Sequence, residues 1–318
     1  MNLDPAVQRF VDVDAGDTLN HLTVTEQRQY MRHLVDLNFL RFSSRGPEVY
    51  SITDHDIAVD GGRVTARVYH PGPEDGLPAH LSLHGGGWWH GSIDDRISDA
   101  IWRQRCAQAR TVVVGLDYRL APEHKFPAAL NDTFAALLWM TDNARALRID
   151  PGNVSVGGSS AGGNLAAALS LKTRDHGGPR LCFQLLEVPA LDLTQATSRQ
   201  AAADGGQGLV DEIGIAIEHY LTDPGQARDP LVSPLLAGDL SGLPAAVIFT
   251  AEMDPLHAEG EQYAQRLAAA GVSARAVRHA GALHGTAMLT RTWAPAAAWQ
   301  QQAADALRQA HWPAKGNR

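Results

Sequence analysis

The feature that most constrains the fold of this chain is an alternation of short apolar runs with segments of helical periodicity. Between two of the runs, Leu130, Phe134, Leu137 and Leu138 recur at the spacing of one helix face. Alternation of this kind predicts a mostly parallel sheet with helices covering both faces. The runs that we expect to form its strands are 79–83, 111–116, 154–156, 181–188 and 245–250.

Three segments depart from this alternation. Residues 52–69 show a β pattern on both sides of Gly61 and Gly62, which predicts an antiparallel hairpin. Residues 1–45 carry scattered apolar positions typical of short helices, and residues about 193–223 form a second helical interruption. We interpret these two helical segments as parts of a lid on a single catalytic domain, residues 1–318.

Composition excludes several classes of function. The net charge of -8 provides no basic surface for nucleic acid, and no run approaches the length of a membrane span. The beginning of the chain lacks the pattern of a signal peptide, so we expect a cytoplasmic protein. Two cysteines, Cys106 and Cys182, are too few for a disulfide framework, and we expect buried thiols. The 14 histidines show no metal-binding spacing, so we expect no metal.

Residues 154–165 combine a short β run, a serine between glycines and a helix rich in alanine and leucine. This is the pattern of a nucleophile elbow, a tight turn from strand to helix that exposes a serine. Gly158 and Gly162 flank Ser160 because larger side chains there would collide with the strand and the helix. The helix N-terminus behind the serine favours developing negative charge. The sequence therefore predicts Ser160 as a nucleophile.

The neighbouring Ser159 is the alternative nucleophile. Its frame places Gly157 and Ala161 at the flanking positions. Because an alanine fits the glycine requirement less well, we assign Ser160.

A second motif lies well upstream, where His84-Gly85-Gly86-Gly87 follows an apolar run. Consecutive glycines leave their backbone N–H groups unshielded, so these groups can point at an oxyanion. We expect Gly85 and Gly86 to donate, and Ala161, which follows the nucleophile, to supply a third N–H.

A serine triad in this setting continues along the chain with an acid and then a histidine. Asp254 follows an apolar run and would lie in the loop after a strand, whereas Glu252 is closer to the strand and more suited to a structural role. His284 precedes a glycine in a loop, while His279 ends a β run. We therefore predict Asp254 and His284 as the partners of Ser160.

With these residues assigned, the chain resembles the bacterial hormone-sensitive-lipase-like esterases, the α/β-hydrolase branch marked by an HGGG motif. That resemblance implies an α/β-hydrolase fold with an eight-stranded sheet, a lid from the N-terminal segment plus an insertion, the same triad and no cofactor. It also implies that Arg119 and Glu123 form polar pairs in a structural brace. The matching runs are 84–88 (HGGGW), 117–124 (DYRLAPEH), 126–129 (FPAA), 233–235 (SPL), 254–256 (DPL) and 284–285 (HG).

The sequence thus predicts a carboxylesterase that hydrolyses short- to medium-chain acyl esters through an acyl-serine. Lactone or amide hydrolysis on the same triad is an alternative. A non-catalytic small-ligand receptor and a lyase are less favoured because His284, the glycines and Ser160 are all present. The expected partner is a small ester, and we also consider a homodimer.

Two further features concern the pocket and the core. Trp88 and Trp89 follow the oxyanion glycines, and we expect at least one to line the pocket and to favour acyl groups of about two to six carbons. Glu187 lies inside an apolar run, where a buried carboxylate needs a partner that the sequence does not identify.

Overall fold

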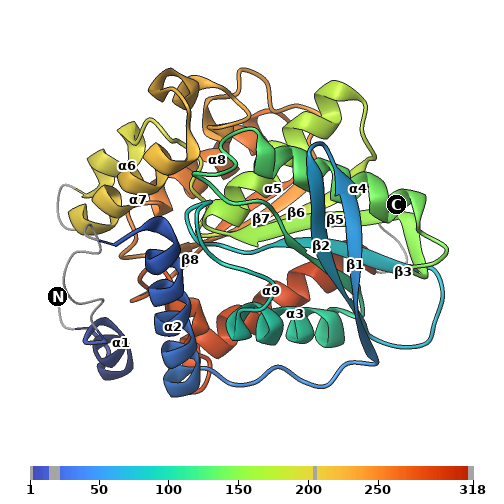
Figure 1. The fold of residues 1–318 in the computed structure, drawn as a ribbon, viewed down its shortest axis with the longest axis horizontal. Helices are drawn as coiled ribbons and strands as arrows, with labels where there is room; N and C mark the ends of the chain where they lie inside the picture. The colour runs from blue at the N-terminus through green and yellow to red at the C-terminus, as the bar shows by residue number, and fades with distance from the viewer. Residues whose placement is uncertain (1–2, 14–21, 203–205, 314–318) are drawn as a thin grey trace.

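The computed structural model describes residues 3–13, 22–202 and 206–313. Its centre is an eight-stranded sheet with the order β1-β2-β4-β3-β5-β6-β7-β8 (Figure 1). β1 pairs antiparallel with β2, β2 pairs antiparallel with β4, and all remaining pairs are parallel. The strands are β1 (Ser51–Val59), β2 (Gly62–His70), β3 (Leu77–Leu83), β4 (Val112–Asp117), β5 (Ile149–Ser159), β6 (Leu181–Glu187), β7 (Ala245–Ala251) and β8 (Ala274–His279).

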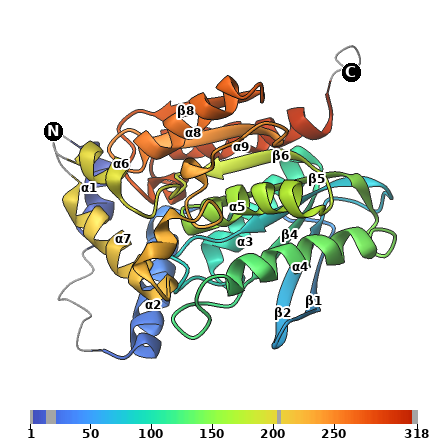
Figure 2. The same cartoon turned by 90° about the horizontal axis from the view of Figure 1, so that it is seen from above.

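Helices cover both faces of this sheet. α3 and α9 lie on one face, and α4, α5 and α8 lie on the other, which Figure 2 shows from above. α1, α2, α6 and α7 gather at one end of the molecule (Figure 1). The α-helices are α1 (Pro5–Val11), α2 (Val24–Phe42), α3 (Arg96–Ala109), α4 (Ala128–Asp142), α5 (Ala161–His176), α6 (Ala196–Ala201), α7 (Gln207–Tyr220), α8 (His257–Ala269) and α9 (Ala294–His311).

Side chains alternate between the two faces along each strand, as the pleat requires. On β7, Ile248 packs in the core shared with α5 and α8, whereas Val247 and Phe249 pack with α9. Trp299 and Leu307 of α9 lie in that second core. The apolar runs of the sequence therefore became strands that are buried on both sides.

The fold confirms the expected mostly parallel sheet and the hairpin, which turns at Gly61. The two expected lid segments contain α1 and α2, and α6 and α7. Their residues 1–2, 14–21 and 203–205 lie outside the described residues.

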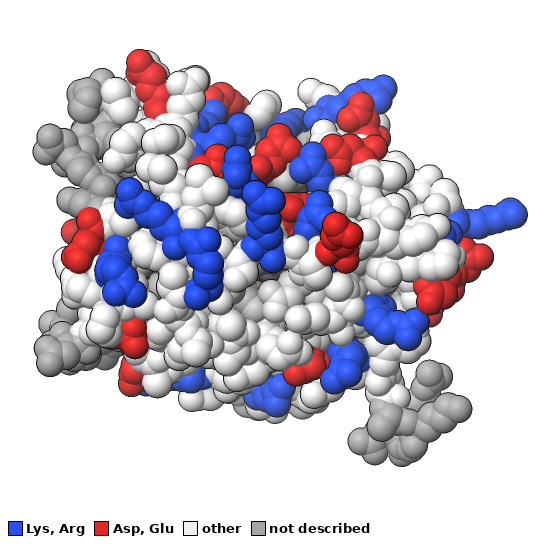
Figure 3. Space-filling model, turned by 90° about the horizontal axis from the view of Figure 1, so that it is seen from below, with Lys and Arg blue, Asp and Glu red and all other residues white. Residues whose placement is uncertain are grey.

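Surface charge is mixed rather than one-sided on the face seen in Figure 3, where acidic and basic side chains are interspersed. Both cysteines are free thiols, with Cys106 buried and Cys182 half-buried. Within the described residues, no helix combines the length and hydropathy needed to cross a bilayer.

Candidate active site

The sheet brings distant parts of the chain to one edge, because parallel strands end on the same side. His84 follows β3, and Ser160 follows β5. Asp254 comes three residues after β7, and His284 comes five residues after β8. The four positions therefore meet at the carboxyl edge of the sheet.

Ser160 lies in the turn between β5 and α5 with φ 55° and ψ -117°. Such a backbone is strained for a residue with a side chain. Gly158 and Gly162 make the turn sterically feasible, since a Cβ on Gly158 would lie 2.5 Å from the carbonyl carbon of Gly162. A Cβ on Gly162 would lie 2.2 Å from the Leu83 carbonyl oxygen. The elbow predicted from the glycine spacing is thus present in the backbone.

Ser160, His284 and Asp254 form a continuous hydrogen-bonded chain. Ser160 Oγ lies 3.1 Å from His284 Nε2, and His284 Nδ1 lies 2.6 Å from Asp254 Oδ2. Asp254 is only 1% exposed, and its second oxygen accepts a 2.9 Å hydrogen bond from Leu256 N–H. With Nδ1–H donating to Asp254, Nε2 is free to accept the proton of Ser160.

The pKa of His284 reflects two opposing effects. Burial alone would lower it, but the charge of Asp254, the hydrogen bond to that carboxylate and the charge of Glu212 together raise the pKa above 6.5. A raised pKa makes the imidazole a stronger base when it is neutral.

The rejected alternatives have other surroundings. Ser159 is the last residue of β5 and pairs with Glu187 of β6. Glu252 accepts a 2.7 Å hydrogen bond from Gly281 N–H. His279 ends β8, and its ring stacks on Trp299 at 4.0 Å between centroids.

The glycine run lies directly beside Ser160. A Cβ on Gly85 would be 3.1 Å from the Ser159 carbonyl oxygen and 3.6 Å from Ser160 Cβ. The start of the run is held by Tyr118, whose hydroxyl donates to the His84 carbonyl at 2.8 Å and whose ring stacks on the His84 ring at 4.2 Å. Ala161 is the first residue of α5, so its N–H belongs to the unpaired first turn of that helix.

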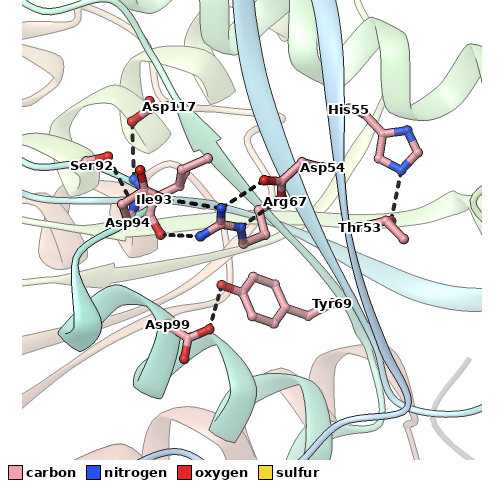
Figure 4. Close-up of polar contacts among 10 residues, drawn as sticks. All are labelled: Thr53, Asp54, His55, Arg67, Tyr69, Ser92, Ile93, Asp94, Asp99 and Asp117. Atoms are coloured by element: carbon pink, nitrogen blue, oxygen red, sulfur yellow. Dashed lines mark hydrogen bonds and ion pairs between the residues drawn. The ribbon is translucent and has the colours of Figure 1, made fainter.

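The segment after the glycine run is fixed to the antiparallel hairpin by Arg67 of β2 (Figure 4). Its guanidinium donates two 2.8 Å hydrogen bonds to Asp54, one of 3.0 Å to the Ile93 carbonyl, and lies 3.1 Å from Asp94. The Ile93 N–H in turn donates to Asp117 at 3.2 Å (Figure 4). These contacts hold the loop that carries the candidate oxyanion donors.

A cavity of about 220 Å³ opens beside the candidate triad. Its wall includes Gly85 and Gly86 of the glycine run, Ser159 beside the nucleophile, and Leu283 and Gly285 on either side of the histidine. Helices α2, α3 and α9 supply further wall residues: Val35, Ser98, Ile101, Trp102, Arg105, Trp299 and Gln300.

Comparison with known proteins identifies the family. A family model described as an α/β-hydrolase fold matches residues 80–288, about two thirds of the chain. The chain belongs to this family, in its hormone-sensitive-lipase-like branch.

Relatives of this α/β hydrolase align over nearly its whole length. It is 37% identical to the carboxylic ester hydrolase LipN of Mycobacterium tuberculosis, over 96% of this chain and 82% of that protein. It is also 37% identical to an arylesterase of Saccharolobus solfataricus, over 89% of this chain and 92% of that one. A hyperthermophilic esterase from Pyrobaculum calidifontis superposes with a TM-score of 0.90 at 34% identity, covering 97% and 99% of the two chains.

In this α/β hydrolase the two tryptophans after the glycines differ in surroundings. Trp88 is 1% exposed and its ring stacks on that of Tyr220 of α7 at 4.7 Å between centroids, so it packs in the core. The expectation that at least one of the two lines the pocket then rests on Trp89. The positive φ of Trp88, 61°, is a local backbone feature that the sequence did not reveal. Trp89 is half-buried and lies 5.6 Å from the ring of His219 in α7.

The brace residues of the DYRLAPEH run form polar pairs, as expected. Arg119 forms an ion pair with Asp132 of α4, whose carboxylate is fully buried. Arg119 also donates to the Asp60 carbonyl at 2.9 Å. Glu123 accepts a 2.8 Å hydrogen bond from Arg28 of α2, whose Nε also donates to the Trp89 carbonyl at 2.6 Å.

Glu187 has partners that sequence reasoning missed. Arg105 of α3 binds both of its oxygens, at 3.0 and 3.1 Å, and Trp299 of α9 donates at 2.8 Å. These partners are 82 and 112 residues away along the chain, so no local sequence pattern predicts them.

A second serine–histidine contact lies earlier on β5. Ser155 Oγ is 2.9 Å from His311 Nε2, and His311 Nδ1 is 2.8 Å from Asn153 Oδ1. Ser155 is 0% exposed, His311 is 3% exposed, and His80 also binds the serine oxygen at 2.8 Å. No substrate carbonyl can reach this buried hydroxyl, so we interpret the cluster as structural.

Metal-assisted chemistry has no candidate ligand set in the part of the chain that the structure describes. Among those residues, no three His, Cys, Asp or Glu side chains gather closely enough to hold a metal ion.

Proposed function

We propose that Ser160, His284 and Asp254 are the catalytic triad with which this enzyme, a carboxylic ester hydrolase of the α/β-hydrolase family, cleaves short- to medium-chain acyl esters. The observation that carries the proposal is the hydrogen-bonded chain from Ser160 Oγ through His284 to Asp254, with distances of 3.1 and 2.6 Å, at a nucleophile elbow.

The proposed reaction is acyl transfer in two halves. Ser160 Oγ attacks the ester carbonyl while His284 Nε2 takes its proton, and Asp254 stabilises the imidazolium. The carbonyl oxygen becomes an oxyanion that accepts hydrogen bonds from the N–H groups of Gly85, Gly86 and Ala161. His284 then gives the proton to the leaving alkoxide, so that an alcohol departs and an acyl-serine remains.

In the second half, His284 takes a proton from a water molecule whose oxygen attacks the acyl carbonyl. The tetrahedral intermediate collapses with the proton returned to Ser160 Oγ, which releases the carboxylic acid and restores the enzyme. All atoms come from ester and water, so the scheme needs no cofactor.

Acyl length follows from the size of the cavity beside the triad. The cavity next to Gly85 and Leu283 has a volume of about 220 Å³. A long alkyl chain extends beyond a space of this size, and each methylene outside it gains none of the usual free energy of burial. We therefore propose an optimum at acyl groups of about two to six carbons.

The test combines activity with labelling. Ser160→Ala and His284→Ala should each lower kcat on a p-nitrophenyl ester by at least about 10³-fold. A fluorophosphonate should modify Ser160 and leave Ser159 free, which peptide mass mapping resolves. Full activity of Ser160→Ala would refute the assignment. A panel of p-nitrophenyl esters, a lactone and an anilide checks chain length and separates ester hydrolysis from the two alternatives.

We further propose that α1 and α2, together with α6 and α7, form the lid over this pocket. Contacts with the active-site loops support it: Phe10 of α1 would lie 3.6 Å from a Cβ on Gly285, and Trp88 stacks on Tyr220 of α7. The cytoplasmic location and the homodimer stay predictions from the sequence, and light scattering of the purified protein tests the dimer.

A further inference from the structure

A buried polar network lies between α3, β6 and α9, and the proposed mechanism does not use it. The paired side chains Arg105 and Glu187 are only 3% and 10% exposed. Glu187 accepts three hydrogen bonds, two from Arg105 and one from Trp299. Together with Gln300, which binds Arg105 at 2.6 Å, these side chains are called the Glu187 network below.

The network contacts the nucleophile turn through the backbone of Glu187. Its carbonyl oxygen accepts a 2.8 Å hydrogen bond from Ser160 N–H. Because Ser160 has a strained backbone, its conformation depends on fixed partners of this kind. The side-chain bonds of Glu187 hold the end of β6 that supplies this carbonyl.

The network contacts the loop that carries His284 through Gln300. Its Oε1 accepts from Arg105, and its Nε2 donates to the Ala287 carbonyl at 3.0 Å. Ala287 lies in the short 3-10 helix Thr286–Met288, three residues after His284. Gln300 is 1% exposed, so this link is shielded from competing water.

We propose that the Glu187 network is a positioning network that fixes the distance between Ser160 Oγ and His284 Nε2. This inference rests on the proposed function. At one end of the network, Glu187 holds the turn that carries Ser160. At the other end, Gln300 holds the loop that carries His284. Since a buried ion pair often adds little net stability, its presence at this place fits a positioning role. A shift of about 1 Å between reacting groups can cost about 100-fold in rate.

The four side chains also line the cavity beside the triad, so a role in substrate contact has to be separated from a positioning role. A residue that binds substrate equally in the ground state and the transition state alters KM, whereas a positioning residue alters kcat. The reaction rate of Ser160 with a small fluorophosphonate adds a readout that does not depend on filling the acyl pocket.

The first variant is Gln300→Met, which keeps the length of the side chain and leaves the Arg105–Glu187 pair intact. We expect kcat on p-nitrophenyl butyrate to fall by about 10-fold or more while KM changes by less than about 3-fold. The fluorophosphonate labelling rate should fall in parallel with kcat.

A second variant removes the charges without leaving one of them unpaired. Glu187→Gln alone would leave Arg105 buried without its counter-ion and could prevent folding. The double variant Arg105→Met/Glu187→Met replaces the pair with apolar side chains of similar size, which proteins often tolerate. We expect it to fold, with kcat lowered at least as much as in Gln300→Met.

His311→Gln is the matched control, because it disturbs another buried polar cluster on the same helix α9. It should lower the melting temperature and leave kcat within about 2-fold of the wild-type value. Wild-type kcat in both network variants, or a raised KM with unchanged kcat, would overturn the positioning role. Ser160→Ala is measured alongside: if it is inactive, the proposed function stands even when this inference fails.

Discussion

At the scale of single residues, the contact between Asp254 and His284 sets the pH dependence that we expect of the proposed triad. Burial works against a charged imidazole, but Asp254, at 2.6 Å, and Glu212 raise the pKa of His284 above 6.5. Only the neutral ring can accept the proton of Ser160. Activity should therefore be present above this pKa and be lost as the pH falls through it.

We predict that kcat/KM falls on the acid side with a midpoint above 6.5. Asp254→Asn removes the charge that raises the pKa, and it should lower kcat by about 10³- to 10⁴-fold because the tautomer of His284 is no longer fixed. The measurement is a pH–rate profile of both proteins with one ester. An acid midpoint that is the same in Asp254→Asn would show that Asp254 does not control His284.

The adjacent tryptophans should respond differently to removal. Trp88→Ala leaves a cavity in the core beside Tyr220, and we expect a loss of about 3–5 kcal/mol in the free energy of unfolding. Trp89→Ala removes a half-buried ring near α7, and we expect a shift in ester preference with a smaller loss of stability. Urea unfolding and the ester panel measure the two effects. If both variants lose the same stability and neither changes its ester preference, both rings are packing residues.

The proximity of Ser160, Asp254 and His284 could be predicted from local spacing in the sequence, because it follows from the glycines around the serine and from chain order after apolar runs. Their catalytic roles stay a prediction. The partners of Glu187 could not be assigned, since Arg105 and Trp299 reach it from α3 and α9 through tertiary packing.

At the scale of elements, Arg28 is one of the residues that attach α2 to the active-site loops. Its guanidinium binds Glu123 and the carbonyls of Trp89 and Ala121. The side chain is 24% exposed, so these bonds are partly shielded from water. Arg28 thus connects the proposed lid to the loop after the candidate oxyanion glycines.

We predict that Arg28→Ala loosens α2 without unfolding the sheet. Losing these hydrogen bonds should lower the local stability of Val24–Phe42 by about 1–3 kcal/mol. Hydrogen exchange followed by mass spectrometry should show faster exchange in α2 than in β5. Arg41→Ala, an exposed position near the other end of α2, is the control. Similar exchange in both variants would argue against anchoring by Arg28.

The boundaries of helices and strands could be predicted only where apolar side chains mark the buried positions. β7 was expected at 245–250 and spans Ala245–Ala251, because each of its residues packs against a helix layer. β5 was expected at 154–156 but spans Ile149–Ser159, since polar residues begin it and glycines end it. α2 is one 19-residue helix where short helices were expected, and its capping box at Thr23 and Glu26 was the overlooked signal.

At the scale of the whole molecule, the sheet carries two serine–histidine clusters with opposite properties. The carboxyl edge holds the proposed triad and a cavity of about 220 Å³. Earlier on β5, Ser155 lies in a buried cluster with His80 and His311 that joins the sheet to the end of α9. The proposed triad must admit substrate, whereas the Ser155 cluster is closed, and its histidines must stay neutral to remain buried.

This buried cluster predicts the acid sensitivity of the protein. Burial lowers the pKa of His311 from 6.5 to about 4. Between these values the unfolded chain binds a proton that the folded chain does not, so stability falls as the pH drops from 6.5 towards 4. Over that window, protonation of His311 in the unfolded chain lowers the free energy of unfolding by about 3 kcal/mol. Above pH 6.5 this destabilisation is absent. His311→Gln should therefore be less stable than the wild type at pH 8 but lose less stability on acidification. Urea unfolding between pH 8 and 4 measures both slopes, and identical slopes would mean that His311 does not titrate in this way.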